Sequence, residues 1–246
     1  MNFIKGKRRV LITSASVFLA LTIIFAVCAV YLGSYYKADD DAIAAFMPDG
    51  CEWREEDNGN LVFEPMGATR GFIFYPGGKV DHSAYIPLMQ ACAEAGILCV
   101  IVEMPFRLAV LDMNAADGIP EMFPEITEWY IGGHSLGGAM AASYVAKHMD
   151  EYEGLILLGA YSTADLSDSD IEVLSIYGSE DGVMNRDKYR ECLENLPDNA
   201  QETVIDGGCH AYFGMYGEQD GDGTPILTAQ EQIYKTADAI LDMITN

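Results

Sequence analysis

Apolar residues along the chain form one long N-terminal run and then a series of short runs. The long run, residues 10–36, contains no charged side chain. Because a membrane-spanning helix needs about 20 predominantly apolar residues, this run predicts a transmembrane helix. The short runs have no apolar–polar alternation, which is typical of strands covered by helices on both faces. They comprise residues 71–75, 97–102, 129–132, 155–158, 173–177 and 203–205.

Stretches of helical character separate the short runs. They comprise residues 83–95, 137–149, 187–196 and 229–244. Strands that alternate with helices predict a doubly wound, mostly parallel sheet. An Asn-Gly pair, Asn58-Gly59, predicts an N-terminal hairpin of two short strands at 51–54 and 61–64. We therefore expect an α/β fold, with residues 1–37 as a basic tip and anchor and residues 38–246 as one domain.

Charge is unevenly distributed along the chain. The formal net charge is −24 and the pI is about 4.2, yet four cations, Lys5, Lys7, Arg8 and Arg9, lie at the start of the chain, and no acidic residue precedes Asp39. Basic residues beside a spanning helix remain in the cytoplasm, which predicts a plasma-membrane anchor with the domain on the extracytoplasmic side. The acidic domain would repel nucleic acid. We therefore expect membrane contact through the N-terminal helix and no nucleic-acid partner.

A cleaved signal peptide is the alternative interpretation of the N-terminal run. Its apolar region would have about 7–15 residues and would end in a small-x-small cleavage site. The run here is longer, and the residues around Cys28 make poor cleavage sites. Val27 is also bulkier than the residue that usually precedes a lipoprotein cysteine. The anchor is therefore the favoured interpretation, although cleavage stays open.

The most informative motif is Gly133-His134-Ser135-Leu136-Gly137, a G-x-S-x-G between a predicted strand and a predicted helix. In that setting the serine lies on a sharp, strained turn at the end of the strand, where it can act as a nucleophile. Glycines flank it because backbones approach closely there. The G-x-S-x-G pattern by itself is weak evidence, because three fixed positions in five occur by chance. Its position between a strand and a helix makes Ser135 the predicted nucleophile.

A serine nucleophile needs a base within hydrogen-bond reach, and in this arrangement the chain order is Ser, then acid, then His. His82 and His134 precede Ser135 in the chain, so they do not fit this order. His148 lies on the predicted helix after the serine, about three turns away, where it should point away from the sheet. His210, in a glycine-containing loop after the last predicted strand, is therefore the predicted base.

The acid should follow a strand end between the serine and the histidine. Residues 177–182 satisfy this condition, with Asp181 as the first choice and Glu180 as the second. Acidic residues at 165–170 are more consistent with a solvated surface loop. The backbone N–H groups of Leu136 and Gly78 are the predicted oxyanion-hole donors, with Gly77 and Lys79 as alternatives to Gly78.

Together these motifs resemble the α/β-hydrolase superfamily, and within it the small, lidless, dienelactone-hydrolase-like bacterial branch. The resemblance rests on residues 74–81, 104–106, 132–138, 177–182 and 207–210. It implies a Ser135–Asp181–His210 triad and hydrolysis of an ester. Two features depart from relatives: dienelactone hydrolases have a cysteine nucleophile where this chain has Ser135, and residues 159–172 are too few for a large lid.

The expected function is therefore that of a serine hydrolase, carboxylesterase-like, that cleaves a small acyl substrate through an acyl-enzyme. Acyl transfer or peptide cleavage on the same triad, or a catalytically silent binding protein with this fold, remain alternatives. No cofactor or metal is expected. The cysteines lack the C-x-x-C spacing of a metal site. An extracytoplasmic location would permit a disulfide, but the sequence does not indicate which two cysteines would form it. The Asp-rich stretch 213–223 lacks the spacing of a calcium-binding loop. That stretch is expected to wall the pocket.

Overall fold

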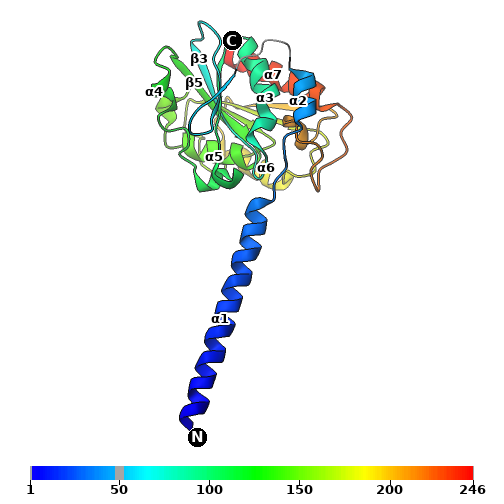
Figure 1. The fold of residues 1–246 in the computed structure, drawn as a ribbon. Coiled ribbons are helices and arrows are strands. Elements are labelled where there is room, and N and C mark those ends of the chain that lie inside the picture. Colours follow the sequence, from blue (N-terminus) through cyan, green and yellow to red (C-terminus); the bar gives the residue numbers. More distant parts are fainter. Residues whose placement is uncertain (1, 48–52, 246) are drawn as a thin grey trace. The chain divides into compact units, whose positions relative to one another are not determined.

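The computed structural model describes residues 2–47 and 53–245, with side chains described from residue 16 onward. It divides into two compact units, Met1–Tyr35 and Tyr36–Asn246. The first unit contains helix α1 (Asn2–Gly33), coloured blue in Figure 1. Its segment Ser16–Gly33 has a mean hydropathy of 2.4 and is long and apolar enough to cross a membrane. An N-terminal signal sequence has the same properties, so both interpretations of this helix remain open.

The second unit is built on an eight-stranded sheet with the order β1-β2-β4-β3-β5-β6-β7-β8. β1 and β2 form the predicted antiparallel hairpin, β2 pairs antiparallel with β4, and the other neighbours are parallel. Each predicted strand is present within a few residues, although positions 51 and 52 lie outside the described residues. The strands are β1 (Arg54–Glu55), β2 (Leu61–Phe63), β3 (Arg70–Tyr75), β4 (Leu98–Ile101), β5 (Glu128–His134), β6 (Gly154–Leu158), β7 (Glu172–Gly178) and β8 (Gln201–Ile205).

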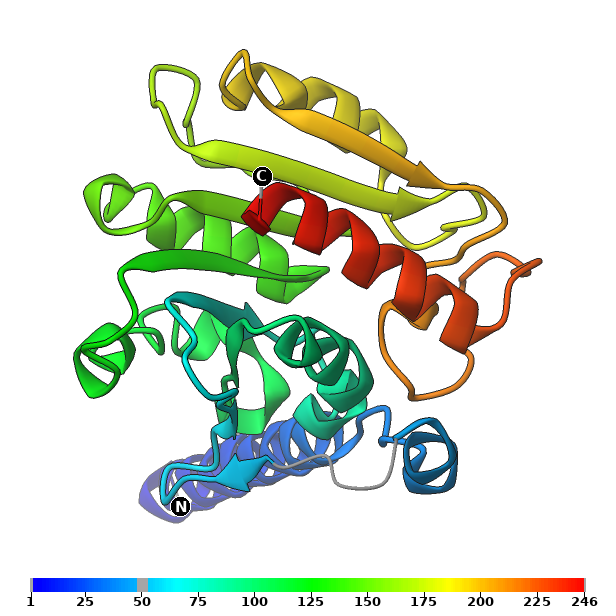
Figure 2. The ribbon, with the colours of Figure 1, turned by 90° about the horizontal axis from the view of Figure 1, so that it is seen from above.

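Helices cover both faces of the sheet, which explains why the strands lack alternation. One buried cluster lies between the sheet and helices α3 (Ile86–Glu94) and α7 (Ala229–Thr245). The other lies between the sheet, helix α5 (Leu136–Val145) and the segment 102–126. Figure 2 shows α7, in red, crossing in front of the strands. The remaining helices are α2 (Asp40–Phe46), α4 (Ile119–Met122) and α6 (Arg186–Cys192).

Two local features differ from the sequence-based expectation. The helix after the serine ends at Val145 instead of continuing to 149, and a separate 3₁₀ turn, Met149–Glu151, follows after a short connection. The segment 102–126, for which no element was expected, forms 3₁₀ turns at Pro105–Arg107 and Ala109–Leu111 and the short α4. Its prolines and Gly118 keep these pieces short.

The direction of the parallel strands determines where the predicted site residues can meet. Because β3, β5, β6, β7 and β8 run in the same direction, the loops that follow them leave at one edge of the sheet. Pro76, Ser135, Gly159, Asp181 and His210 all lie in these loops or just beyond the strand ends. The fold therefore assembles at one edge residues that are up to 134 positions apart in the sequence.

Candidate active site

Ser135 lies at the sharp turn between β5 and α5. Its φ of 52° and ψ of −120° are unusual for a residue with a side chain, and strain of this kind is concentrated at functional sites. Its N–H donates to the Leu158 carbonyl at 2.9 Å. A Cβ at Gly133 or Gly137 would overlap the Tyr75 carbonyl. The flanking glycines are thus required by close backbone approach, as the motif predicted.

His210 and Asp181 form a buried hydrogen-bonded pair. His210 Nδ1 lies 2.8 Å from Asp181 Oδ2, and their side chains are 1% and 0% exposed. The other carboxylate oxygen, Oδ1, accepts the backbone N–H groups of Val183 at 2.9 Å and Met184 at 2.8 Å. These bonds fix the carboxylate, which in turn orients the imidazole. His210 Nε2 is buried and has no hydrogen-bond partner among the described residues.

Ser135 and His210 line the same cavity, which has a volume of about 380 Å³. Apart from His210, the described residues that line it include no acidic or basic side chain. Most of its wall comes from the first turns of α5 and from the loops after β6 and β7. The lining residues are Ser135, Leu136, Ala139, Met140, Gly159, Ala160, Tyr161, Thr163, Val183, Met184, Asn185 and His210.

The two predicted oxyanion donors lie against each other. A Cβ placed on Gly78 would come within 2.9 Å of Leu136 Cδ2, and the Leu136 N–H belongs to the first turn of α5, where helix N–H groups lack intrahelical partners. The alternatives to Gly78 are engaged elsewhere. The Gly77 N–H donates to the Tyr85 hydroxyl at 3.1 Å, and the Lys79 N–H donates to the Arg107 carbonyl at 2.8 Å.

A second histidine and a tyrosine lie directly behind the site, and sequence reasoning gave neither a role. The Tyr85 hydroxyl accepts the Gly77 N–H and lies 2.8 Å from His134 Nδ1, and the His134 ring centroid is 4.5 Å from that of His210. Burial, and then the charge of His210, lower the pKa of His134 well below its usual value. Burial raises the pKa of Tyr85. Both shifts favour the uncharged forms, so a protonated Tyr85 hydroxyl shares a hydrogen bond with a neutral His134 imidazole.

The other residues considered from the sequence lie elsewhere. Glu180 accepts from the Ser179 hydroxyl, His82 Nε2 lies 3.1 Å from the Gly59 carbonyl, and His148 pairs with Glu151. The acidic residues at 165–170 are mainly solvent-exposed. The expectation that residues 213–223 wall the pocket is wrong, because none of them lines the cavity that contains Ser135; this loop packs behind His210 instead.

Neither metal-binding nor disulfide geometry is found in the part of the chain that the structure describes. There, no group of three or more His, Cys, Asp or Glu side chains could hold a metal ion. Cys28, Cys92, Cys99, Cys192 and Cys209 have free thiols. The sixth cysteine, at position 51, lies outside the described residues.

Comparison with known proteins identifies the family. Residues 71–234 match the sequence profile described as the alpha/beta hydrolase family. The chain belongs to this family. The match covers all five strands that carry site residues, and family membership supports hydrolase activity. No curated protein matches the chain.

Several solved structures superpose on most of the domain. Est1E from Butyrivibrio proteoclasticus is 14% identical, with a TM-score of 0.57 over 80% of this chain and 100% of its own. A dienelactone hydrolase from Anabaena variabilis is 13% identical, with a TM-score of 0.58 over 78% of this chain and 97% of its own. A protein called TT1662 from Thermus thermophilus is 14% identical, with a TM-score of 0.56 over 79% of this chain and 99% of its own. At these identities the likeness concerns the fold, and it confirms the predicted α/β-hydrolase architecture.

Proposed function

We propose that this hydrolase is a serine carboxylesterase that uses Ser135 as nucleophile, His210 as general base and Asp181 as the orienting acid. The observation that carries the proposal is the buried His210–Asp181 bond beside a strained serine that lines the same cavity. His210 Nε2 is buried and unpaired among the described residues. It is therefore available to accept the Ser135 hydroxyl proton.

The proposed reaction proceeds in two half-reactions. Ser135 Oγ attacks the acyl carbon while His210 Nε2 takes the hydroxyl proton, and the carbonyl oxygen becomes an oxyanion. The Gly78 and Leu136 N–H groups stabilise that oxygen. His210 then protonates the leaving alcohol, which departs and leaves an acyl-serine. Water, deprotonated by His210, releases the carboxylic acid and restores Ser135.

The cavity supports a neutral acyl group of small to medium size. About 380 Å³ is at the lower end of ligand-pocket volumes, which run from roughly 300 to 1,000 Å³. Met140 and Met184 contribute flexible apolar surface, and Tyr161 contributes one aromatic ring. Est1E, similar in fold, has been solved with ferulic acid bound. We therefore expect turnover of short alkyl and aryl esters. We also propose that α1 anchors the enzyme in the plasma membrane, with the domain outside the cell.

Fluorophosphonate labelling of the full-length chain, with location of the adduct by mass spectrometry, tests the proposal. We expect the adduct on Ser135, and we expect Ser135→Ala to lose both labelling and ester hydrolysis with little change in Tm. His210→Ala should reduce the labelling rate by at least about 10³-fold, in line with the loss of a triad member. Ser143→Ala, a serine on the same helix, is the control. A folded wild-type protein that does not label at Ser135 would contradict the proposal.

A further inference from the structure

One carboxylate outside the proposed triad joins the two loops that carry the acid and the base. Asp222 lies in the irregular segment between His210 and α7, and its side chain is half-buried. Its two oxygens accept four backbone N–H groups. The donors and distances are Gly182 at 3.0 Å, His210 at 3.1 Å and Gly223 at 2.8 Å, all to Oδ1, and Ala211 at 2.8 Å, to Oδ2.

Two of these donors adjoin the proposed triad directly. Gly182 follows Asp181 in sequence, and the His210 N–H belongs to the base itself. Asp222 Oδ1 therefore bridges the backbone of the acid loop and the backbone of the base loop. A further bond between these loops, from the Glu180 N–H to the Gly208 carbonyl at 2.8 Å, lies one or two residues farther back on each side. Along the sequence, the contacts of Asp222 therefore lie closer to Asp181 and His210 than this bond does.

The approach of Asp222 to the acid loop depends on glycine. A Cβ on Gly223 would overlap the Glu180 carbonyl, and a Cβ on Gly182 would come within 2.7 Å of the Gly221 carbonyl. The segment is thus packed against the acid loop with no room for side chains between the two backbones. This close packing holds the Asp222 carboxylate where all four donors can reach it.

The environment favours the charged form of this carboxylate. Burial acts to raise the pKa of Asp222, but the N–H donors of Gly182, Ala211, His210 and Gly223 outweigh it and lower the pKa. Hydrogen bonds to an ionised acceptor are shorter and stronger than neutral ones. An asparagine at this position could keep one oxygen for the Gly182 and His210 N–H groups, whereas an alanine removes both acceptor oxygens and all four bonds.

We propose that Asp222 is a positioning residue, which holds the backbone of His210 against the Asp181 loop so that the imidazole keeps its alignment toward Ser135. This inference rests on the proposed triad. Catalytic side chains must be held within about 0.5 Å of their productive positions, and a shift of about 1 Å can reduce a rate 10²-fold. Asp222 does not line the substrate cavity, so we expect loss of the clamp to slow the chemical step more than it weakens substrate binding.

The first test compares Asp222→Ala with Asp220→Ala in the full-length chain. Asp220 lies two residues earlier in the same loop, and its side chain is exposed, so its replacement removes the same charge without the clamp. We expect kcat for a short-chain p-nitrophenyl ester, and the rate of fluorophosphonate labelling, to fall roughly 10- to 100-fold in Asp222→Ala. KM should change less than about twofold, and Asp220→Ala should resemble the wild type. A rate within twofold of wild type, or a loss confined to KM, overturns the inference.

A double-mutant cycle separates positioning from a general loss of stability. If Asp222 acts through the Asp181–His210 pair, Asp222→Ala should have little further effect on labelling in an Asp181→Asn background, because interacting sites are not additive. Equal factors in the two backgrounds would overturn the proposal. A readout independent of turnover is the downfield proton NMR signal of His210 Nδ1–H. That signal should persist in Asp220→Ala and weaken or disappear in Asp222→Ala, whereas an unchanged signal contradicts the clamp. Absence of wild-type labelling with these NMR results would refute the proposed function and leave the clamp standing.

Discussion

At the scale of single residues, the space around the His210–Asp181 pair is set by a glycine. A Cβ on Gly159 would come within 2.9 Å of His210 Nδ1 and 3.2 Å of Asp181 Oδ2. Gly159 also has a φ of +52°, a conformation that costs other residues about 1–2 kcal/mol. The loop after β6 can therefore support the pair only if this position has no side chain.

Gly159→Ala should for this reason reduce kcat by more than its effect on stability explains. The added methyl group pushes His210 away from Asp181, and we expect roughly a 10²-fold loss, as for a misplaced catalytic group. Gly96→Ala is a matched control because Gly96 has a φ of +93° but nothing within 4 Å of its Cβ position. Tm and kcat of the two variants, measured side by side, check the prediction. Equal activity losses at equal destabilisation would contradict it.

At the scale of elements, the start of α3 braces the loop that follows β3. Tyr85 closes the 3₁₀ turn His82–Tyr85 before α3 and links the Gly77 N–H to His134 on β5. Gly77 precedes Gly78, the predicted oxyanion donor. Packing of one helix start therefore sets the position of a loop and of the strand that ends at the nucleophile, so three elements must be in register before the oxyanion hole is formed.

Tyr85→Phe should lower kcat about tenfold with little change in KM. This loss is smaller than the roughly 10²- to 10³-fold fall in kcat that removal of an oxyanion donor causes. The buried Gly77 N–H would lose its partner, at a cost of about 1–3 kcal/mol in stability. Tyr75→Phe is the control, because the Tyr75 hydroxyl is also buried and bridges two backbone groups, at Met113 and Ala116. We expect a similar fall in Tm in both variants but a kcat loss only in Tyr85→Phe. A matching kcat loss in Tyr75→Phe would refute the bracing role.

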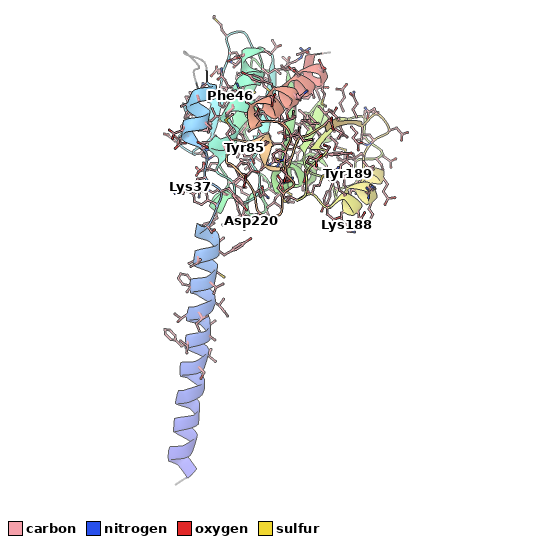
Figure 3. All side chains as sticks on the ribbon, turned by 90° about the vertical axis from the view of Figure 1, so that its right-hand side faces the viewer. Lys37, Phe46, Tyr85, Lys188, Tyr189 and Asp220 are labelled. Atoms are coloured by element: carbon pink, nitrogen blue, oxygen red, sulfur yellow. The ribbon has the colours of Figure 1, made fainter. Side chains whose placement is uncertain are left out.

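At the scale of the whole molecule, the first residues of the second unit join the loops at the site's edge of the sheet. The Tyr36 backbone pairs with Lys79 and Asp81, and its hydroxyl accepts the Asp220 N–H at 3.2 Å. The Asp39 N–H donates to the Met215 carbonyl at 2.8 Å. Figure 3 labels Lys37 and Asp220 on the same side of this unit. The segment after α1 is therefore part of the scaffold of the site.

The point of truncation should accordingly decide whether the second unit stays active without α1. A chain that starts at Ser34 keeps these bonds and should label with fluorophosphonate at the full-length rate. A chain that starts at Asp40 loses them, and we expect a lower Tm and labelling slowed severalfold, because the loops at 79–81 and 215–220 lose a shared partner. Equal labelling rates and equal Tm values for the two truncated chains would show that the segment is only a linker.

The sequence by itself determined the order of strands and helices along the chain and the strained turn at Ser135, and it predicted which acid and which histidine lie near that turn. These features are local: continuous apolar runs, glycines beside Ser135 and loops just after strands can be read without knowing what lies across the sheet. The same local information could not choose among Gly77, Gly78 and Lys79 as oxyanion donors. The tertiary structure favours Gly78 in the proposed site, because it engages the N–H groups of Gly77 and Lys79 elsewhere.

Only the tertiary structure shows which residues contact the proposed site through partners distant in sequence. In the sequence, Tyr85 is one residue of a predicted helix, His134 occupies a variable position of the G-x-S-x-G motif, and Asp222 is one of several acidic residues in a loop. Each takes part in a hydrogen bond with a residue at least 8 positions away: a backbone group for Tyr85 and Asp222, and the Tyr85 hydroxyl for His134. Hydrogen bonds of this kind leave no periodic pattern, because the donor and acceptor are brought together by the packing of the sheet and its loops.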